Sequence, residues 1–568
     1  MKRTFLKLSI YALSLCFLPA MAARYHVNVN NGSDTNNGLK WSTAFETFQA
    51  ALDEAKANDT IWIASGIYTP TKKYAEKYRD GSLTNERAFS FIIPDGVVVL
   101  GGFPANSSDA TGLSSRDWKA NETILSGDLN GDDDYGFRTE NAHHVIIMFD
   151  ATPKTVIDGF NIYGAYNDAP QTAYHNDDRG YAITYGCGAA IYSFSSVTVA
   201  SPTLRNLFVS DNFASYEGAG LFNYAPNNDA SPEITNVEFT GNKVVSKSTS
   251  GGRGGGLHIE GRTTSAKLTS VIISGNTALS EGSSFGGGAY FKTVNDCTPT
   301  IQNSLIAGNI ANGGAGLFFN SWSGETALAI AKTAPTLINV TISGNKANAL
   351  NNSSGYNDGG GMTVFAEDGV ASPIIRNTVI CDNAGDKQNE LLVVGVKGSN
   401  PTFSHSFIKG IDLGSTNLPG NTSTASMFAN PGNAADAPFP NGFQRCNYQL
   451  LPESPLVNKG NNSYLSLSRD LAGENRVYGI TIDIGAYESQ GGIPSNNDNL
   501  TPEKSIWAAA NTLYVHIDNQ TTLRIYSISG ILIKHIDNLA AGSYEFSLPK
   551  GLYIVTLSNG ATEKVVIK

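Results

Sequence analysis

Six stretches of this chain close in the same way, and their spacing constrains the fold more than any other feature. Each carries alternating apolar residues and ends on asparagine: SPTLRNLFVSDN (201–212), SPEITNVEFTGN (231–242), SAKLTSVIISGN (265–276), TPTIQNSLIAGN (298–309), APTLINVTISGN (334–345) and SPIIRNTVICDN (372–383). The closing asparagines are Asn212, Asn242, Asn276, Asn309, Asn345 and Asn383, with steps of 30, 34, 33, 36 and 38 residues. A weaker copy follows at 400–410. Repetition of this kind indicates a solenoid, whose units bury their apolar side chains only by stacking on one another.

A second repeated element, glycine followed by a short apolar strand, lies between these stretches. Its copies are GAAIYS (188–193), GAGLFN (218–223), GGGLHI (254–259), GGGAYF (286–291), GAGLFF (314–319) and GGGMTV (359–364). The strands are short and alternating, and no helical pattern separates them. We therefore expect each unit to contain a strand, a turn, another strand and a variable loop. This pattern predicts an all-β fold, a right-handed parallel β-helix solenoid. A leucine-rich repeat would need a shorter period and a leucine ladder, and a β-propeller would need four strands per blade.

The start of the repeat region carries a candidate cap for the open end of the solenoid. Residues 43–57 place Phe45, Phe48, Leu52 and Ala55 on one helical face, and Thr43 with Glu46 matches a capping box. Strands are expected on either side, at 25–29 and 60–64. The sequence thus predicts an N-terminal capping helix.

The first 23 residues have the pattern of a secretory signal. Lys2, Arg3 and Lys7 precede the apolar run 8–18, and Ala20-Met21-Ala22 supplies a small-x-small cleavage site. We expect no transmembrane segment in the mature chain. The formal net charge is −11, without a basic stripe, which argues against nucleic acid as a partner. These features predict a protein that is secreted after cleavage of its signal peptide.

Two regions resemble a known family. The stretch 25–71, which begins YHVNVNNGSDTNNG, looks like the opening of secreted bacterial pectin-lyase-like β-helix proteins. SPLVNKGNNS (454–463), RDLAGENRVYG (469–479) and IDIGAYE (482–488) resemble the closing module of that family. The resemblance implies a β-helix over 24–488, with an N-terminal cap at 24–70, the clearest repeats at 186–410 and a closing module at 450–488. It implies less about activity, because this fold hosts lyases, hydrolases and adhesins.

The composition changes after residue 488. Residues 489–505 read as a linker, and 506–568 contain short alternating strands typical of a small β-sandwich. RIYSISGILI (524–533), LPKGLYIVTL (548–557) and EKVVIK (563–568) resemble the C-terminal sorting domain of the type IX secretion pathway of Bacteroidota. This resemblance implies that the type IX secretion machinery is a partner, and that the protein crosses the outer membrane and is then released or anchored on the outer-membrane surface. An ordinary immunoglobulin-like module is the alternative.

Strand alternation predicts an outward row of aromatic side chains one position after the first apolar residue of each glycine-led strand. We interpret Tyr192, Phe222, Tyr290 and Phe318 as candidate ligand-binding residues, since stacked aromatic rings can bind sugar rings. The alternative is that these rings only stack on one another and stabilise the sheet.

The same face carries the best candidates for catalysis. His258, Glu260, Tyr290 and Lys292 fall on neighbouring coils. Lys292 or His258 could abstract a proton from a polysaccharide and Tyr290 could donate one. The alternative is a plain ion pair between Glu260 and Lys292. Neither the acidic cluster of a calcium-dependent lyase nor a two-carboxylate hydrolase pair is evident.

One loop, SGDLNGDDD (126–134), has the alternating oxygen ligands of a calcium site: Asp128, Asn130, Asp132 and Asp134. It departs from the EF-hand pattern at positions six and twelve, and an exposed acidic turn is the alternative. No cofactor other than calcium is indicated. Cys187 and Cys297 lie about three coils apart, too distant for a disulfide, and the repeat geometry argues against most other pairings. We therefore expect Cys187, Cys297, Cys381 and Cys446 to be free and buried.

These observations favour an exported β-helix protein that binds glycans or extracellular material and acts as a monomer. A polysaccharide lyase or glycoside hydrolase is the first alternative, and a structural surface protein without catalytic activity is the second.

Overall fold

The computed structural model describes residues 22–74, 86–133, 138–169, 174–176, 182–184, 186–249, 251–322, 330–348, 359–385, 390–439 and 446–491 of the first part of the chain. In the last part it describes 506–509, 512–517, 520–527, 532–540, 542–558 and 562–567. The candidate ligand Asp134, nearly all of the predicted signal and most of the predicted linker lie outside these ranges. The chain divides into two compact units, residues 1–494 and 495–568.

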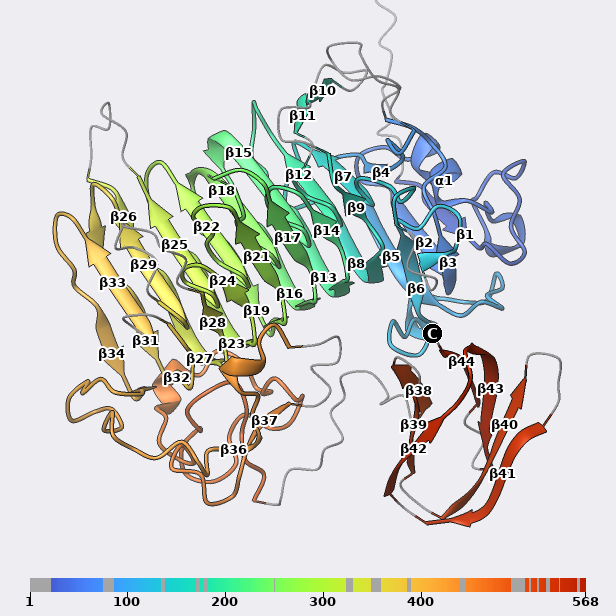
Figure 1. Ribbon diagram of the computed structural model, residues 1–568. Helices are drawn as coiled ribbons and strands as arrows, with labels where there is room; N and C mark the ends of the chain where they lie inside the picture. Colours follow the sequence, from blue (N-terminus) through green and yellow to red (C-terminus); the bar gives the residue numbers. More distant parts are fainter. Residues whose placement is uncertain are drawn as a thin grey trace, which may run out of the picture. The chain divides into compact units, whose positions relative to one another are not determined.

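The first unit is a parallel β-helix built mainly from three long sheets (Figure 1). Sheet 1 takes one strand from each coil in the order β1 (Arg24–Val27), β2 (Thr60–Ala64), β5 (Val98–Phe103), β8 (Val156–Tyr163), β13 (Thr203–Ser210), β16 (Glu233–Thr240), β19 (Lys267–Thr269), β23 (Thr300–Ala307), β27 (Thr336–Ser343), β31 (Ile374–Arg376) and β34 (Thr402–Ser404). It also contains the shorter strands β3 (Gly66–Tyr68), β6 (Thr123–Ser126), β20 (Ile272–Ser274), β32 (Val379–Cys381) and β35 (Phe407–Ile408).

The glycine-led strands form sheet 2, in the order β4 (Phe91–Ile93), β7 (Ile146–Phe149), β12 (Ile191–Phe194), β15 (Leu221–Asp229), β18 (Leu257–Thr263), β22 (Ala289–Thr293), β25 (Leu317–Ser321), β29 (Met362–Ala366) and β33 (Leu391–Gly395). Their pairing is parallel and follows the sequence alignment: Leu221 pairs with Leu257, and Leu257 with Ala289. Gly218 allows the turn before β15, because its φ is 62° and an added Cβ would lie 2.6 Å from the Leu221 carbonyl oxygen. The predicted fold class is confirmed.

The repeat contains a third strand that the sequence analysis missed. Sheet 3 consists of β9 (Tyr166–Asn167), β14 (Phe213–Ala214), β17 (Lys243–Ser246), β21 (Thr277–Ser280), β24 (Ile310–Ala311) and β28 (Lys346–Ala347). Most of these strands have only two residues, too few to display an alternating pattern. Minor pairs complete the unit: β10 (Tyr174–Asn176) with β11 (Ala182–Thr184), β26 (Lys332–Thr333) with β30 (Val370–Ala371), and β36 (Phe428–Asn430) with β37 (Asn447–Leu450).

The recurrent asparagines form a buried ladder that runs from coil to coil. From Asn242 through Asn383, the Oδ1 atom of each asparagine accepts the backbone N–H and the Nδ2 group of the asparagine on the preceding coil. Asn212 begins the ladder, and its Oδ1 accepts the N–H of Ala165. Asn383 then donates to Glu390. A second row lies six residues earlier and was missed: Asn206, Asn236, Ser270, Asn303, Asn339 and Asn377 all have positive φ. These residues place a bend in each sheet 1 coil.

The N-terminal cap differs from the prediction in its details. A short 3-10 turn covers Trp41–Thr43, and α1 extends only over Phe48–Glu54. The predicted Thr43–Glu46 capping box is wrong, because Thr47 is the N-cap and its side chain accepts the N–H of Ala50. Asp34 accepts the backbone N–H groups of Glu46 and Thr47, which holds that segment extended.

The closing segment folds back onto the bends of sheet 1. Asn377 exchanges hydrogen bonds with Asn461, and Ala486 donates its N–H to Thr341 Oγ1. Short 3-10 turns in the described part of the unit include Leu113–Ser115, Ala434–Asp436 and Asn462–Tyr464. The closing segment thereby covers part of sheet 1.

The second unit is a small antiparallel β-sandwich. One sheet has the order β38 (Ile506–Ala509), β39 (Thr512–Ile517), β42 (Gly542–Ser547), and the other β41 (Leu532–Leu539), β40 (Thr521–Ser527), β43 (Gly551–Leu557), β44 (Thr562–Ile567). Leu513, Leu523 and Val555 contribute to its shared core.

The four cysteines of the described chain are free, as expected; three are buried and Cys446 is half-buried. Among the described residues, no helix is both long and apolar enough to cross a membrane.

Candidate functional site

The outer side of sheet 2 carries the residues that the sequence analysis singled out. The inner side chains, such as Leu221 and Ala289, belong to the main core, whereas the residues that follow them, Phe222 and Tyr290, belong to separate clusters. The predicted alternation is therefore confirmed.

The first outer row of aromatic side chains is buried, as in the alternative in which these rings stack on one another and stabilise the sheet. Tyr192, Phe222, Tyr290 and Phe318 are only 0–4% exposed. Neighbouring rings lie 5.5–5.6 Å apart within the Tyr192–Phe222 and Tyr290–Phe318 pairs. Side chains that precede the glycine turns, including Tyr216 and Phe285, pack onto the same clusters. These aromatics thus form a second, outer apolar layer.

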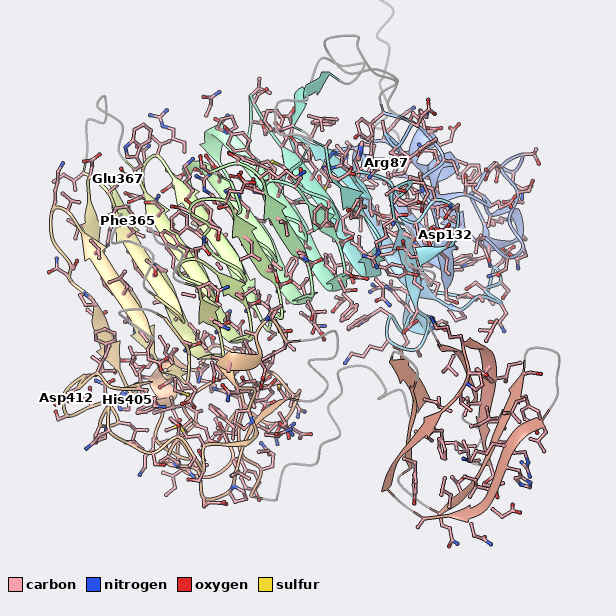
Figure 2. All side chains as sticks on the ribbon, in the orientation of Figure 1. Arg87, Asp132, Phe365, Glu367, His405 and Asp412 are labelled. Carbon is pink, nitrogen blue, oxygen red and sulfur yellow. The ribbon has the colours of Figure 1, made fainter. Side chains whose placement is uncertain are left out.

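A second outer row, two residues further along each strand, is partly accessible. Its half-buried members are Phe194, Tyr224, Glu260, Lys292 and Asn320, and parallel pairing places them side by side on β12, β15, β18, β22 and β25. We call these five residues the surface row. The row continues on β29 to the buried Phe365, which Figure 2 labels beside Glu367.

The middle of the surface row is tied to a chain of alternating charges. Lys292 Nζ donates to Glu260 Oε1 at 2.7 Å, and Glu260 Oε2 lies 3.2 Å from His258 Nε2. On its other side, His258 Nδ1 lies 3.3 Å from Glu217 Oε2, and Arg253 donates to Glu217 Oε1 at 2.6 Å. His258 is fully buried, with Tyr290 and Phe222 edge-on to its ring. We call Arg253, Glu217, His258, Glu260 and Lys292 the charge chain.

The structure thus brings together all four predicted catalytic residues. His258 pairs with Tyr290, and Glu260 with Lys292, across β18 and β22. Glu217 and Arg253 are not among the residues predicted from the sequence. Both precede the first glycine of a glycine-led strand, and the two positions are bridged to each other on adjacent coils. Aligning that position in the repeats would have found them.

The pKa directions follow from this alternation. Burial alone would raise the pKa values of Glu217 and Glu260, but His258 and the neighbouring cations outweigh burial and lower both. Burial alone would lower the pKa of Lys292, but the charge of Glu260 gives a net increase. Burial raises the pKa of Tyr290 as well. The charge chain therefore holds its acids ionised and its lysine protonated.

These protonation states limit the chemistry of the cluster. A lysine base needs a lowered pKa, and a carboxylic acid that protonates a leaving group needs a raised one. Oxygen and nitrogen atoms of Glu217, His258 and Glu260 lie within 4.8 Å of one another, a spacing compatible with a metal ion. However, both carboxylates already form ion pairs with cations, Glu217 with Arg253 and Glu260 with Lys292. The arrangement therefore favours a charge network.

The predicted calcium loop lies elsewhere, after β6 (Asp132 in Figure 2). Asp128 accepts backbone N–H groups of Gly131 and Asp133, so its carboxylate organises the turn. Asn130 Nδ2 donates to Asp132 Oδ2 at 3.1 Å, and so Asn130 supports Asp132. Asp128, Asp132 and Glu140 offer oxygens within 4.8 Å of one another. Glu140, which follows the loop in sequence, was missed.

The donor set of this loop fits calcium in one further respect. Asp132 Oδ1 and Glu140 Oε1 are buried and accept no hydrogen bond in the part of the chain that the structure describes. Carboxylate oxygens are the ligands that calcium prefers. Calcium binding here remains a prediction.

Comparison with known proteins does not assign a family. No family model matches the chain, and no curated protein matches it. Among solved structures, a pectate lyase, Pel9A, has a TM-score of 0.37 at 13% identity, covering 82% of this chain and 96% of that one. A GH136 lacto-N-biosidase from Eubacterium ramulus has a TM-score of 0.25 at 10% identity, covering 69% of this chain and 57% of that one. The fold assignment accordingly rests on the sheets described above.

Proposed function

We propose that this chain is an exported β-helix protein that binds a glycan along the surface row of sheet 2. The observation that carries the proposal is the order of half-buried side chains along the row. Two aromatic rings, Phe194 and Tyr224, are followed by Glu260, Lys292 and Asn320. Export is supported by the signal-like residues 1–23 and by the resemblance of 506–568 to a sorting domain.

The aromatic end of the row suits the apolar faces of sugar rings. The Phe194 and Tyr224 ring centroids are 5.8 Å apart, and the rings rest on the buried layer of Tyr192 and Phe222. Burial, followed by the charge of Glu260, raises the pKa of Tyr224 to about 12, so its phenol stays neutral at physiological pH. Rigid, partly buried aromatic rings lose little conformational entropy on binding.

The polar end of the row offers hydrogen bonds to sugar hydroxyl groups. Glu260 and Lys292 hold each other in place, with side chains 19% and 31% exposed. Asn320 follows on the next strand. Adjacent parallel strands lie about 4.8 Å apart, so an extended sugar chain crossing the strands would meet a new side chain at each step.

The test is affinity electrophoresis of the purified full-length protein against laminarin, xylan, alginate and mucin glycans. Tyr224→Ala should weaken binding about tenfold, the effect of losing roughly 1.4 kcal/mol of ring contact. Tyr166→Ala is the matched control, because Tyr166 is also half-buried and stacks on Phe213, at 4.7 Å, but on sheet 3. Equal losses in both variants, or binding unchanged by Tyr224→Ala, would refute the surface row as the site.

A polysaccharide-cleaving activity is the second candidate, because the four predicted catalytic residues lie together. The raised pKa of Lys292 and the lowered pKa of Glu260 weigh against it. Incubation with the same polysaccharides distinguishes the two. New reducing or unsaturated ends that disappear in Lys292→Ala would establish an enzyme, whereas retention without products supports binding alone.

A further inference from the structure

His258 lies in an environment that fixes its protonation state. It is on the outer side of β18 and fully buried. Its Nδ1 lies 3.3 Å from a carboxylate oxygen of Glu217 and its Nε2 lies 3.2 Å from one of Glu260, and neither nitrogen makes a hydrogen bond to another described residue. The rings of Phe222 and Tyr290 enclose it from the neighbouring strands, at centroid distances of 5.2 and 5.0 Å.

A neutral imidazole does not fit between two carboxylates. It carries one N–H and one lone pair, so one nitrogen would present its lone pair to a carboxylate oxygen. In a buried site that repulsion is not screened by water. An imidazolium instead attracts both carboxylates, as ion pairs of 3.3 and 3.2 Å, even though neither of its nitrogens is aligned for a hydrogen bond.

We propose that His258 is held as an imidazolium and acts as a positioning residue, which fixes the Glu260 carboxylate and through it Lys292 in the surface row. The binding part of this inference rests on the proposed glycan-binding function. The protonation part rests on the geometry around His258 alone.

The groups that face His258 from every neighbouring element account for the charge balance. Glu217 and Arg253 come from the segments before β15 and β18, Glu260 from β18, and Lys292 from β22. The negative charges of the two carboxylates balance the positive charges of Arg253 and Lys292. The cluster therefore carries a net charge of +1 when His258 is protonated and zero when it is neutral. Tyr224, Tyr290 and Cys187 also lie in this neighbourhood, and burial raises the pKa of each, which keeps them neutral.

The titration of His258 determines the direction in which glycan affinity should change with pH. Burial alone would lower the pKa of His258, but Glu217 and then Glu260 give a net increase above the ordinary value of 6.5. When the pH rises through this increased pKa, one ring nitrogen becomes an acceptor facing a carboxylate. Glu260, the more exposed of the two acids, then loses its fixed orientation. Glycan affinity should therefore fall as the pH rises through the His258 titration.

The protonation state is tested by ¹⁵N NMR of the full-length protein labelled at histidine, from pH 5 to pH 9. His258→Gln assigns the signals of His258. We expect both of its nitrogens to be protonated at pH 6.5, and Glu217→Gln to move the transition to lower pH. Glu233→Gln is the matched control, because Glu233 pairs with Lys267 on sheet 1. A neutral His258 at pH 6.5, or a midpoint unmoved by Glu217→Gln, would overturn the proposal.

The positioning role is tested by measuring affinity for laminarin, xylan, alginate and mucin glycans over the same pH range. For any that binds, we expect affinity to fall about fivefold, the equivalent of roughly 1 kcal/mol, over the range in which His258 titrates. Glu217→Gln should shift that fall to lower pH, which a merely structural role would not do. If His258 titrates while affinity stays constant, the positioning role is wrong. If none of these glycans binds at any pH, the proposed function fails, and the NMR titration still decides the protonation state.

Discussion

The Oδ1 atom of Asn276 accepts both the backbone N–H of Asn242, at 3.0 Å, and its side-chain Nδ2, at 3.2 Å. In turn, Asn276 Nδ2 donates to the carbonyl oxygen of Phe239. Both asparagines are buried, so water cannot replace these bonds. Each coil therefore depends on the amide of the next one, and the ladder couples neighbouring coils at the turn between sheets 1 and 3.

We predict that Asn276→Ala destabilises the β-helix by about 3 kcal/mol. The change leaves the backbone N–H of Asn242 buried without its acceptor, at a cost of about 1–3 kcal/mol. It also removes one of the two bonds of Asn242 Nδ2, which still donates to the Val209 carbonyl, and the bond from Asn276 to the Phe239 carbonyl. Equilibrium denaturation in urea measures the loss. Asn227→Ala serves as control, since Asn227 is exposed and makes a single long bond of 3.4 Å. A difference between the variants below about 1 kcal/mol would show that the ladder contributes little.

Glu390 ends the ladder and makes its stability depend on pH. Burial raises the pKa of Glu390 to about 7, although its bonds from Asn383 act in the opposite direction. A carboxyl group whose pKa is raised on folding stabilises the fold fully below its ordinary pKa, and that contribution is lost as the pH rises through the folded value. The ionisation of Glu390 should therefore decrease the unfolding free energy as the pH rises from about 4.5 to about 7.

Glu390→Gln should remove the pH-dependent contribution of this carboxyl group to the unfolding free energy. The amide can still accept from Asn383 but carries no charge to bury, so we expect a gain of about 1–3 kcal/mol at pH 8 and little change at pH 4.5. Thermal or urea unfolding of both proteins at pH 4.5 and pH 8 measures this difference in stability. An equal effect at both would mean that the ionisation of Glu390 is not the cause.

Tyr224 of the surface row and Phe222 of the buried layer beneath it should respond differently to substitution by alanine. Tyr224→Ala should reduce glycan affinity and leave stability within about 1 kcal/mol, because the side chain is half-buried. Phe222→Ala, one layer below, should cost about 3–5 kcal/mol of stability. Melting curves recorded with and without glycan separate the two effects. A stability loss in Tyr224→Ala as large as that in Phe222→Ala would contradict the layered arrangement.

The loop after β6 predicts stabilisation by calcium. If Asp132 and Glu140 bind the ion, 1 mM calcium should raise the unfolding free energy by about 1–3 kcal/mol, and EDTA should reverse the gain. Asp132→Asn should abolish the effect. Asp412→Asn is the control, because Asp412 is exposed in a turn at the opposite end of the β-helix (Figure 2). If calcium still stabilises the Asp132→Asn variant, the ion binds at another site.

The sequence by itself determined the coil period, the parallel register of sheets 1 and 2 and the alternation of inner and outer side chains. Each of these follows from local spacing: Asn276 recurs one coil after Asn242, and Leu257 pairs with Leu221 as the glycine-led strands align. The proximity of Glu260 and Lys292 could be predicted for the same reason.

Only the tertiary structure decided which outer side chains are accessible. Phe222 and Tyr290 alternate outward as predicted, yet Tyr216 and Phe285 pack onto their clusters from the segments before the glycine turns. Likewise, Glu217 reaches His258 from the preceding coil, a contact that no spacing within one strand reveals. Burial and ion pairing depend on how coils stack and where the loops fold back, and the repeat leaves these variable segments unspecified.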